Sequence, residues 1–297
     1  MNIFNRACTN LAADQGLAVS GSQEYYSGHE PATAIAESKL FRNIKGIIFD
    51  FDGTIFDNAL FPFYLISAYP PDVIRIWKER LIRRQFAGCD YNSTEEYEQA
   101  FFNAFAKISI SSPARIRYWY FNRYVPRMAR TLKKHFKPRP GAVELFKRFD
   151  TGSTDKLKIA VYSDYPSLKD RLEALGIYPG ADVFLYGPES FGAQKPAAQP
   201  FRIIAKDLGV APEEVLVIGD REDTDGLGAF HAGMHFFCLE TGRKRYHRLD
   251  PNRSPPAPQE PHGPSLVMYA GVWDDLVKAL TENFFPDKTN SNTRLVK

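Results

Sequence analysis

Cysteine is scarce in this chain of 297 residues, and long apolar runs are absent. Cys8, Cys89 and Cys238 lie far apart with no Cys-x-x-Cys spacing, which argues against a disulfide framework or a cysteine metal site. No stretch approaches the roughly 18 uncharged apolar residues that a membrane-spanning helix needs, so we expect no membrane partner. Residues 1–17 have no sustained apolar core of the kind that a secretory signal carries. Together these absences predict a cytoplasmic protein.

A strong excess of one charge sign is also missing. The net charge is +3, and the chain has 44% hydrophobic and 25% charged residues, which is ordinary globular composition. The whole-chain balance therefore implies no dedicated nucleic-acid partner. A basic run at 243–248 follows an expected strand, and we interpret it as a solvated loop rather than as a nucleic-acid contact.

Two segments stand apart from the rest by their composition. Residues 1–40 are polar with weak periodicity, which predicts a flexible N-terminal extension. Residues 249–265 are rich in proline, which predicts an extended, poorly packed loop.

Short apolar runs alternate with helical patterns over most of the remaining chain. The runs that read as strands cover 46–49, 157–163, 182–186, 215–219, 234–239 and, near the end, 266–270. The helical patterns cover 141–149, 167–176, 200–209, 224–232 and 272–280. This alternation predicts an α/β fold with right-handed crossovers and a parallel sheet covered on both faces. In such sheets ligands bind beyond the carboxyl ends of the strands.

Residues 57–138 interrupt this pattern. A crossover between parallel strands needs only about a dozen residues, whereas this segment is aromatic-rich and mostly helical over about eighty. It predicts a helical subdomain with helices at 64–86, 94–107 and 113–136. The segment holds 14 Lys and Arg against 7 Asp and Glu, so its basic side chains could attract an anionic substrate. We interpret most of them as a solvated face.

Two aspartates follow the first apolar run. Asp50 and Asp52 are two residues apart at the end of the expected strand, so both side chains can face one pocket. Such a pair suits a carboxylate nucleophile beside a carboxylic acid that donates and then accepts a proton. The alternative is a polar turn after a core strand, with Asp52-Gly53 as ordinary turn chemistry.

Two further strand ends carry groups suited to a phosphoryl group. Ser163, beside Asp164, follows the second strand, and its hydroxyl and the neighbouring N–H groups can donate to phosphoryl oxygens. A helix cap is the plainer interpretation of Ser163 alone. Lys195 stands in an expected loop, where it could neutralise both a carboxylate and a phosphoryl group.

The fourth strand supplies more carboxylates. Asp220 directly follows the apolar run at 215–219, and Asp225 opens the next helix. With Asp50 from a neighbouring strand they would offer the hard oxygen ligands that Mg²⁺ prefers. An N-cap role for Asp223 or Asp225 is the alternative, and one residue can have both roles.

These signals, taken in order, resemble a known series. Asp50-x-Asp52-Gly53-Thr54, Ser163, Lys195-Pro196 and Gly219-Asp220…Thr224-Asp225 resemble the four motifs of the haloacid dehalogenase superfamily, over about residues 44–240. The resemblance implies a Rossmann-like core at 41–56 and 139–285 with an α-helical cap at 57–138.

The resemblance also implies roles for the site residues. Asp50 would be the nucleophile that becomes an aspartyl-phosphate, and Asp52 the acid that protonates the leaving oxygen and then activates water. Phosphate binding would fall to Thr54, Ser163, Asp164 and Lys195. The Mg²⁺ ligands would be Asp50, the backbone carbonyl of Asp52, Asp220 and Asp225.

Asp52 favours one reaction over others. Dehalogenases of the superfamily lack an aspartate two residues after the nucleophile, whereas phosphotransferring members carry one. We therefore hypothesise a Mg²⁺-dependent phosphatase that hydrolyses a small phosphomonoester metabolite. A phosphomutase of the same family and a non-catalytic binding protein with this fold are the alternatives.

Overall fold

The computed structural model describes residues 40–91, 93–150, 157–241 and 268–285. The extension expected at 1–40 (except Leu40), the basic run at 243–248 and the proline-rich loop expected at 249–265 lie outside these residues.

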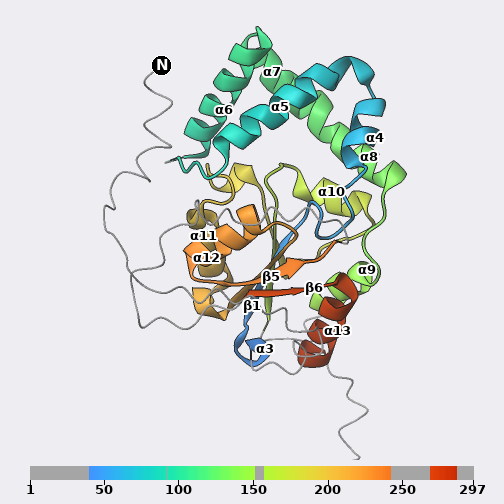
Figure 1. Ribbon diagram of the computed structural model, residues 1–297, viewed down its shortest axis with the longest axis vertical. Helices are drawn as coiled ribbons and strands as arrows, with labels where there is room; N and C mark the ends of the chain where they lie inside the picture. Colours follow the sequence, from blue (N-terminus) through green and yellow to red (C-terminus); the bar gives the residue numbers. More distant parts are fainter. Residues whose placement is uncertain (1–39, 92, 151–156, 242–267, 286–297) are drawn as a thin grey trace, which may run out of the picture.

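A parallel sheet forms the centre of the molecule (Figure 1). Its six described strands run in the order β3-β2-β1-β4-β5-β6, and every neighbouring pair is parallel. The strands are β1 (Gly46–Asp50), β2 (Lys158–Tyr162), β3 (Val183–Tyr186), β4 (Val215–Gly219), β5 (His235–Leu239) and β6 (Met268–Gly271). The predicted α/β fold with a Rossmann-like parallel sheet is confirmed.

The order of the strands places a switch point between β1 and β4. From β1 the chain adds strands on one side as far as β3 and then returns to add β4, β5 and β6 on the other side. Phe49 pairs with Val161 of β2 and with Ile218 of β4, so β1 is central. Open α/β sheets bind ligands at such a point, beyond the carboxyl ends of the strands.

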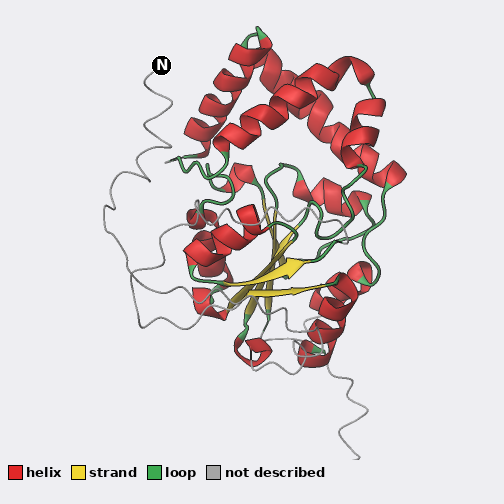
Figure 2. Ribbon diagram, in the orientation of Figure 1, coloured by secondary structure: helices red, strands yellow, loops and turns green. Residues whose placement is uncertain are grey.

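Helices cover both faces of the sheet (Figures 1 and 2). The helices of the core are α9 (Ala142–Asp150), α10 (Leu168–Ala174), α11 (Ala198–Leu208), α12 (Leu227–Ala232) and α13 (Trp273–Phe284), and the short α3 (Leu40–Asn43) lies at the lower end of the molecule, before β1. Since side chains alternate along a strand, the central strands feed two apolar clusters. Phe49 packs with Phe146 and Phe149 of α9 on one face, and Ile48 belongs to a cluster with Phe201 of α11 on the other.

A helical insertion between β1 and β2 stands over the carboxyl ends of the strands (Figure 2). We call it the cap. It comprises α4 (Phe61–Ser67), η1 (Pro70–Asp72), α5 (Val73–Phe86), α6 (Thr94–Ser109), α7 (Pro113–Trp119), η2 (Tyr120–Tyr124) and α8 (Val125–His135). The expectation of one helix over 64–86 is wrong, because α4 ends before Pro70 and Pro71 and a new helix starts at Val73.

Short helical segments complete the core: η3 (Pro188–Ser190), η4 (Pro212–Glu214) and η5 (Glu222–Gly226). Cys238 in β5 is a free, buried thiol. Within the described part of the chain, every helix is too short or too polar to cross a bilayer.

Candidate active site

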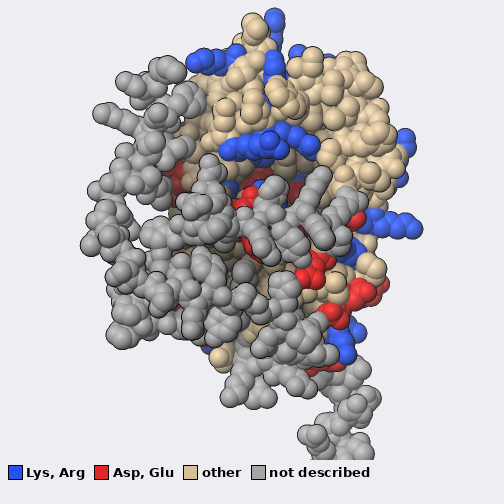
Figure 3. All heavy atoms as spheres, in the orientation of Figure 1, with Lys and Arg blue, Asp and Glu red and all other residues tan. Residues whose placement is uncertain are grey.

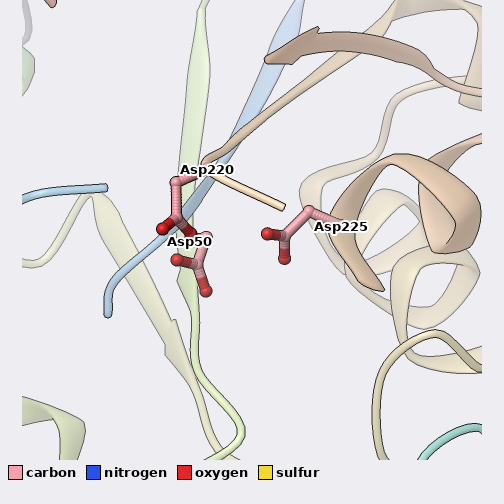
Figure 4. A group of neighbouring side chains, drawn as sticks. All are labelled: Asp50, Asp220 and Asp225. Atoms are coloured by element: carbon pink, nitrogen blue, oxygen red, sulfur yellow. The ribbon is translucent and has the colours of Figure 1, made fainter. Parts of the chain in front are cut away.

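Three carboxylates meet at the switch point of the sheet (Figure 4). Asp50 ends β1, Asp220 follows β4 directly, and Asp225 lies in η5, the next turn of the chain. One oxygen atom from each lies within 4.8 Å of the other two. The predicted convergence of Asp50 with Asp220 and Asp225 therefore occurs, because β1 and β4 are hydrogen-bonded neighbours.

Glycine at two positions allows this close approach. Gly53 has a φ of +104°, and a Cβ atom there would lie 2.2 Å from Asp220 Oδ2. At Gly219 a Cβ atom would lie 2.5 Å from Asp225 Oδ2. Any side chain at either position would push a carboxylate out of the cluster.

The cluster is electrostatically unfavourable without a cation in addition to Lys195. Burial, followed by the charge of Asp225, raises the pKa of Asp50 to about 7. Burial and the charge of Asp50 likewise raise the pKa of Asp220 well above its usual range. Burial raises the pKa of Asp225, although Lys195 opposes the shift. A bound divalent cation would relieve this repulsion.

The donor set fits Mg²⁺. Asp220 Oδ1 is buried and has no hydrogen-bond partner among the described residues, so one hard oxygen is left for another ligand. Three carboxylates that can share one ion match the chemistry that Mg²⁺ prefers.

Lys195 partly balances the carboxylates. Its Nζ donates to Asp50 Oδ1 at 2.6 Å, to Asp225 Oδ1 at 2.8 Å and to the carbonyl of Tyr162 at 3.1 Å. Burial alone would lower the pKa of Lys195, but Asp225 and Asp50 raise it, so the ammonium keeps its charge. The expected contact between Lys195 and Asp50 is therefore present.

Asp52 and Ser163 form a second group beside the cluster. Ser163 Oγ donates to Asp52 Oδ2 at 2.9 Å and accepts from the N–H of Tyr165 at 3.1 Å. Ser163 does not cap α10, whose N-cap residue is Ser167.

Arg171 joins Asp52 and Ser163, and the sequence interpretation missed it. It donates to Asp52 Oδ2 at 2.8 Å and to Ser163 Oγ at 2.7 Å. One signal could have found it: Arg171 occupies the apolar face of its helix with Leu168, Leu172 and Leu175, all of which are buried. A charged residue on such a face needs a buried partner.

The two remaining expected phosphate-binding residues contact the site itself. Thr54 Oγ1 donates to Asp50 Oδ2 at 3.0 Å. Asp164 Oδ1 accepts from the backbone N–H of Lys195 at 3.1 Å, and burial raises the pKa of Asp164. Since a carboxylate repels phosphate, only the backbone N–H of Asp164 is suited to phosphate binding.

Comparison with known proteins identifies the family of this chain. The sequence model of one family, described as haloacid dehalogenase-like hydrolase, matches residues 44–233. The chain belongs to this family. The match spans β1 to α12, including the whole cap.

Individual relatives are distant. A glyceraldehyde 3-phosphate phosphatase of Methanopyrus kandleri is 37% identical over 70 residues, which are 24% of this chain and 29% of that protein. The match therefore spans less than a third of that relative's length. A solved 2-haloacid dehalogenase of Pseudomonas syringae pv. Tomato DC3000 has a TM-score of 0.50 and 16% identity, over 80% of this chain and 99% of that one. An L-2-haloacid dehalogenase of Xanthobacter autotrophicus has a TM-score of 0.49 and 17% identity, over 80% and 98%.

The cap of this haloacid dehalogenase-like hydrolase is tied to the loop that carries Lys195. The N–H of Gly88 donates to the carbonyl of Lys195, and the N–H of Tyr91 to that of Gly192, both at 3.1 Å. In the reverse direction, the N–H of Gln194 donates to the carbonyl of Cys89, also at 3.1 Å. The loop that positions the ammonium therefore pairs with the cap through backbone hydrogen bonds.

A buried side-chain network strengthens this junction. Arg83 of α5 donates to the backbone carbonyl of Asp164 at 2.6 Å and pairs with Glu79 at 2.6 Å. Its guanidinium lies 4.1 Å from the ring centroid of Tyr165, and Tyr120 accepts a further bond at 2.8 Å. Arg83 lies on the buried face of α5 with Ile76, Glu79 and Phe86, but that spacing does not identify its partners, which join the cap to the loop after β2.

Proposed function

We propose that this hydrolase is a Mg²⁺-dependent phosphatase that acts on a small phosphorylated metabolite. The observation that carries the proposal is the site itself, in which Asp50 lies in a cluster of three carboxylates and a lysine while Asp52 is held beside it. A phosphoryl group in transfer carries charge on three equatorial oxygens, and cations with aimed donors stabilise that charge.

The first half-reaction uses Asp50 as nucleophile. One of its carboxylate oxygens forms a bond to phosphorus while the ester P–O bond breaks, and the departing oxygen takes a proton from Asp52. The alcohol leaves, and Asp50 remains as an aspartyl-phosphate. Lys195 and Ser163 would hold phosphoryl oxygens, and each contacts one of the two aspartates, Lys195 contacting Asp50 and Ser163 contacting Asp52.

The second half-reaction restores Asp50. Asp52, now ionised, accepts a proton from a water molecule whose oxygen bonds to phosphorus, and the P–O bond to Asp50 breaks. Inorganic phosphate leaves, and Asp52 has regained its proton for the next turnover. Bound Mg²⁺, held by Asp50, Asp220, Asp225 and the Asp52 carbonyl, would supply positive charge to the phosphoryl oxygens.

The division of the chain follows from this assignment. We assign the chemistry to a core of residues 41–56 and 139–285, and substrate enclosure to the cap at 57–138. Figure 3 shows Lys and Arg side chains along the lower edge of the cap, above a recess that contains Asp and Glu side chains. Positive charge at that edge would favour entry of an anionic ester. By its name, the Methanopyrus kandleri relative acts on a small phosphate ester, which supports the proposed substrate class.

A panel of phosphate esters, with and without Mg²⁺, tests the proposal. We expect release of inorganic phosphate that requires Mg²⁺, and a loss of at least about 10³-fold in Asp50→Asn with an unchanged circular dichroism spectrum. Asp223→Asn is the matched control, because Asp223 lies next to the cluster but pairs with Arg221 at 2.6 Å. Full activity of Asp50→Asn would contradict the mechanism, and no release of phosphate from any ester would contradict the function.

A further inference from the structure

Arg171 is a fully buried guanidinium beside the proposed acid/base. Its relative exposure is 0%. The ring of Phe51 lies under it, with 4.6 Å between the guanidinium carbon and the ring centroid, and the corresponding distance to Tyr165 is 5.8 Å. Burial of a cation is unfavourable unless its donors are paired, so the partners of Arg171 indicate what it does.

Those partners form a closed group around Asp52. Nη1 of Arg171 donates to Asp52 Oδ2 at 2.8 Å, and Nη2 donates to Ser163 Oγ and to the carbonyl of Tyr165, both at 2.7 Å. Ser163 Oγ in turn donates to the same Oδ2 atom at 2.9 Å. Asp52 and Ser163 are therefore held relative to each other by one planar fork.

All of the hydrogen bonds to the Asp52 carboxylate that involve described residues fall on Oδ2. The Asp52 side chain keeps 22% of its exposure although Arg171 is buried. Oδ1 is thus the oxygen left to face the substrate. A carboxylate fixed through one oxygen presents the other in a defined direction, which proton transfer to a leaving group requires.

We propose that Arg171 is a positioning residue that aims Asp52 Oδ1 at the leaving-group oxygen and holds Ser163 in register with it. This inference rests on the proposed phosphatase function. The guanidinium touches no reacting atom, and its effect passes through Asp52. A lysine could not replace it, because one ammonium cannot reproduce the fork that spans Asp52, Ser163 and Tyr165.

The dependence of the rate on the leaving group distinguishes a residue that positions Asp52 from one that only stabilises the fold. An alkyl phosphate releases a strongly basic oxygen that needs the proton of Asp52, whereas p-nitrophenyl phosphate releases a stable phenolate that hardly needs it. For Arg171→Met we expect kcat/KM to fall about 100-fold on the alkyl ester and less than about 10-fold on the aryl ester. Both esters undergo the same attack by Asp50, so their ratio isolates the proton transfer.

Arg127→Met is the matched control. Arg127 of α8 is likewise a buried guanidinium that pairs with one carboxylate, Asp72, at 2.5 Å and lies over one ring, that of Tyr69. It is remote from Asp52 in the chain and lies within the cap. Its variant should lose stability while the ratio of the two kcat/KM values stays unchanged.

Two further outcomes complete the test. Should Arg171→Met not fold, Arg171→Lys keeps the charge and loses the fork, and we expect the same selective loss on the alkyl ester, reduced to about 10-fold. Equal losses on both esters in the variant that folds would overturn the positioning role. Failure of the proposed function is a different result, since the unmutated protein would then release phosphate from neither ester.

Discussion

Asp50, Asp220 and Asp225 bring three carboxylates together, two of them buried, with one oxygen of each within 4.8 Å of the other two. Their raised pKa values have burial as the first cause and neighbouring charges next, and Lys195 is a buried ammonium that contacts the group. Such a cluster is better suited to binding a cation than to stabilising the fold, because a metal ion would supply the positive charge that offsets the carboxylates.

Removal of one charge should therefore stabilise the metal-free protein. We predict that Asp220→Asn raises the free energy of unfolding by about 1–2 kcal/mol at pH 8 in the presence of a chelator, because burial and the charges of Asp50 and Asp225 disfavour the ionised Asp220. The same variant should lose most of the stabilisation that Mg²⁺ gives to the unmutated protein. Thermal unfolding with and without Mg²⁺ measures both effects, and a less stable metal-free variant would contradict the account.

The stability of the metal-free protein should depend on pH, and the sign of that dependence follows from the pKa of Asp50. The pKa of Asp50 is about 7 in the folded protein and close to the usual 3.8 in the unfolded chain, so the folded state binds this proton more tightly. The penalty is thus fully present only well above pH 7, and it is relieved as the pH falls through 7 towards 4. Since His231 and His235 have lowered pKa values and act in the opposite sense, the comparison is made with Asp220→Asn, which keeps both histidines and Asp50 but lacks Asp220, whose pKa is also raised. Between pH 8 and 6, metal-free unmutated protein should gain more stability than the variant.

Substitution of Gly53 should disturb the position of Asp220. Its φ is +104°, and a Cβ atom there would lie only 2.2 Å from Asp220 Oδ2, which leaves no room for a side chain. Gly53→Ala should reduce Mg²⁺-dependent turnover by more than about 100-fold, because Asp220 must move. Gly176→Ala is the control, since its φ of +77° carries similar strain but no atom of the described residues would lie within 4 Å of its Cβ. Equal effects of the two substitutions would show that strain, and not the carboxylate, decides the outcome.

Among individual residues, the sequence predicted the carboxylates of the site better than the arginines that contact the site and its surrounding loops. Asp50 and Asp220 follow buried strands, and the end of a parallel strand has a fixed place in the fold. Arg171 and Arg83 lie within helices, where a basic residue is usually solvated, and their partners come from distant segments. Only their positions on buried helix faces distinguish them.

Among the elements, α5 joins the cap to the site. Arg83, near its C-terminal end, contacts the carbonyl of Asp164, and the chain that follows pairs with residues 192–195. Glu79 is one turn earlier and completely buried, with Arg83 and Tyr124 as its partners. The ion pair between Glu79 and Arg83 therefore stabilises the junction between cap and core.

Breaking this pair should be costly. We predict that Arg83→Met lowers the free energy of unfolding by about 3–5 kcal/mol, because Glu79 would be left as an unpaired buried charge. The double variant Glu79→Leu with Arg83→Met should recover a large part of that loss. Urea unfolding of the unmutated protein, the single variant and the double variant measures these free energies. A double variant no more stable than the single one would contradict the interpretation of the pair.

Strands and most helices of the core follow from periodicity and turn residues, as the agreement between expected and observed elements shows. The cap is harder to predict, because Pro70 and Pro71 divide an otherwise helical apolar pattern, and a π-helical turn precedes α8. Tertiary packing of aromatic side chains, and not local propensity, holds these short helices in place.

For the whole molecule, the cap and the loop that carries Lys195 form one hydrogen-bonded unit. We predict that the amides of Tyr91 and Gln194 exchange with solvent at similar, slow rates, since both bond across the junction. Inorganic phosphate with Mg²⁺ should slow both further. Hydrogen exchange with mass spectrometry measures this, and fast exchange at Tyr91 alongside slow exchange at Gln194 would show that the pairing is not maintained in solution.

This long-range pairing could not be read from the sequence. Residues 88–91 and 192–195 are about a hundred positions apart, and neither segment has a strand pattern of its own. The fold class was predictable because it depends on strand and helix patterns that recur along the sequence. The junction depends on tertiary contacts between the cap and the core, which leave no local pattern.

The most direct test of the central claim is a chemical trap of the intermediate. Asp52→Asn should slow attack by water on the aspartyl-phosphate, so the variant is mixed with Mg²⁺ and p-nitrophenyl phosphate, quenched, and treated with borohydride, which reduces an acyl phosphate to an alcohol. Peptide mass spectrometry should then find homoserine at position 50, and none without Mg²⁺ or in the variant that also carries Asp50→Asn. Release of p-nitrophenol with Asp50 unmodified, or with the modification at another carboxylate, would contradict the account.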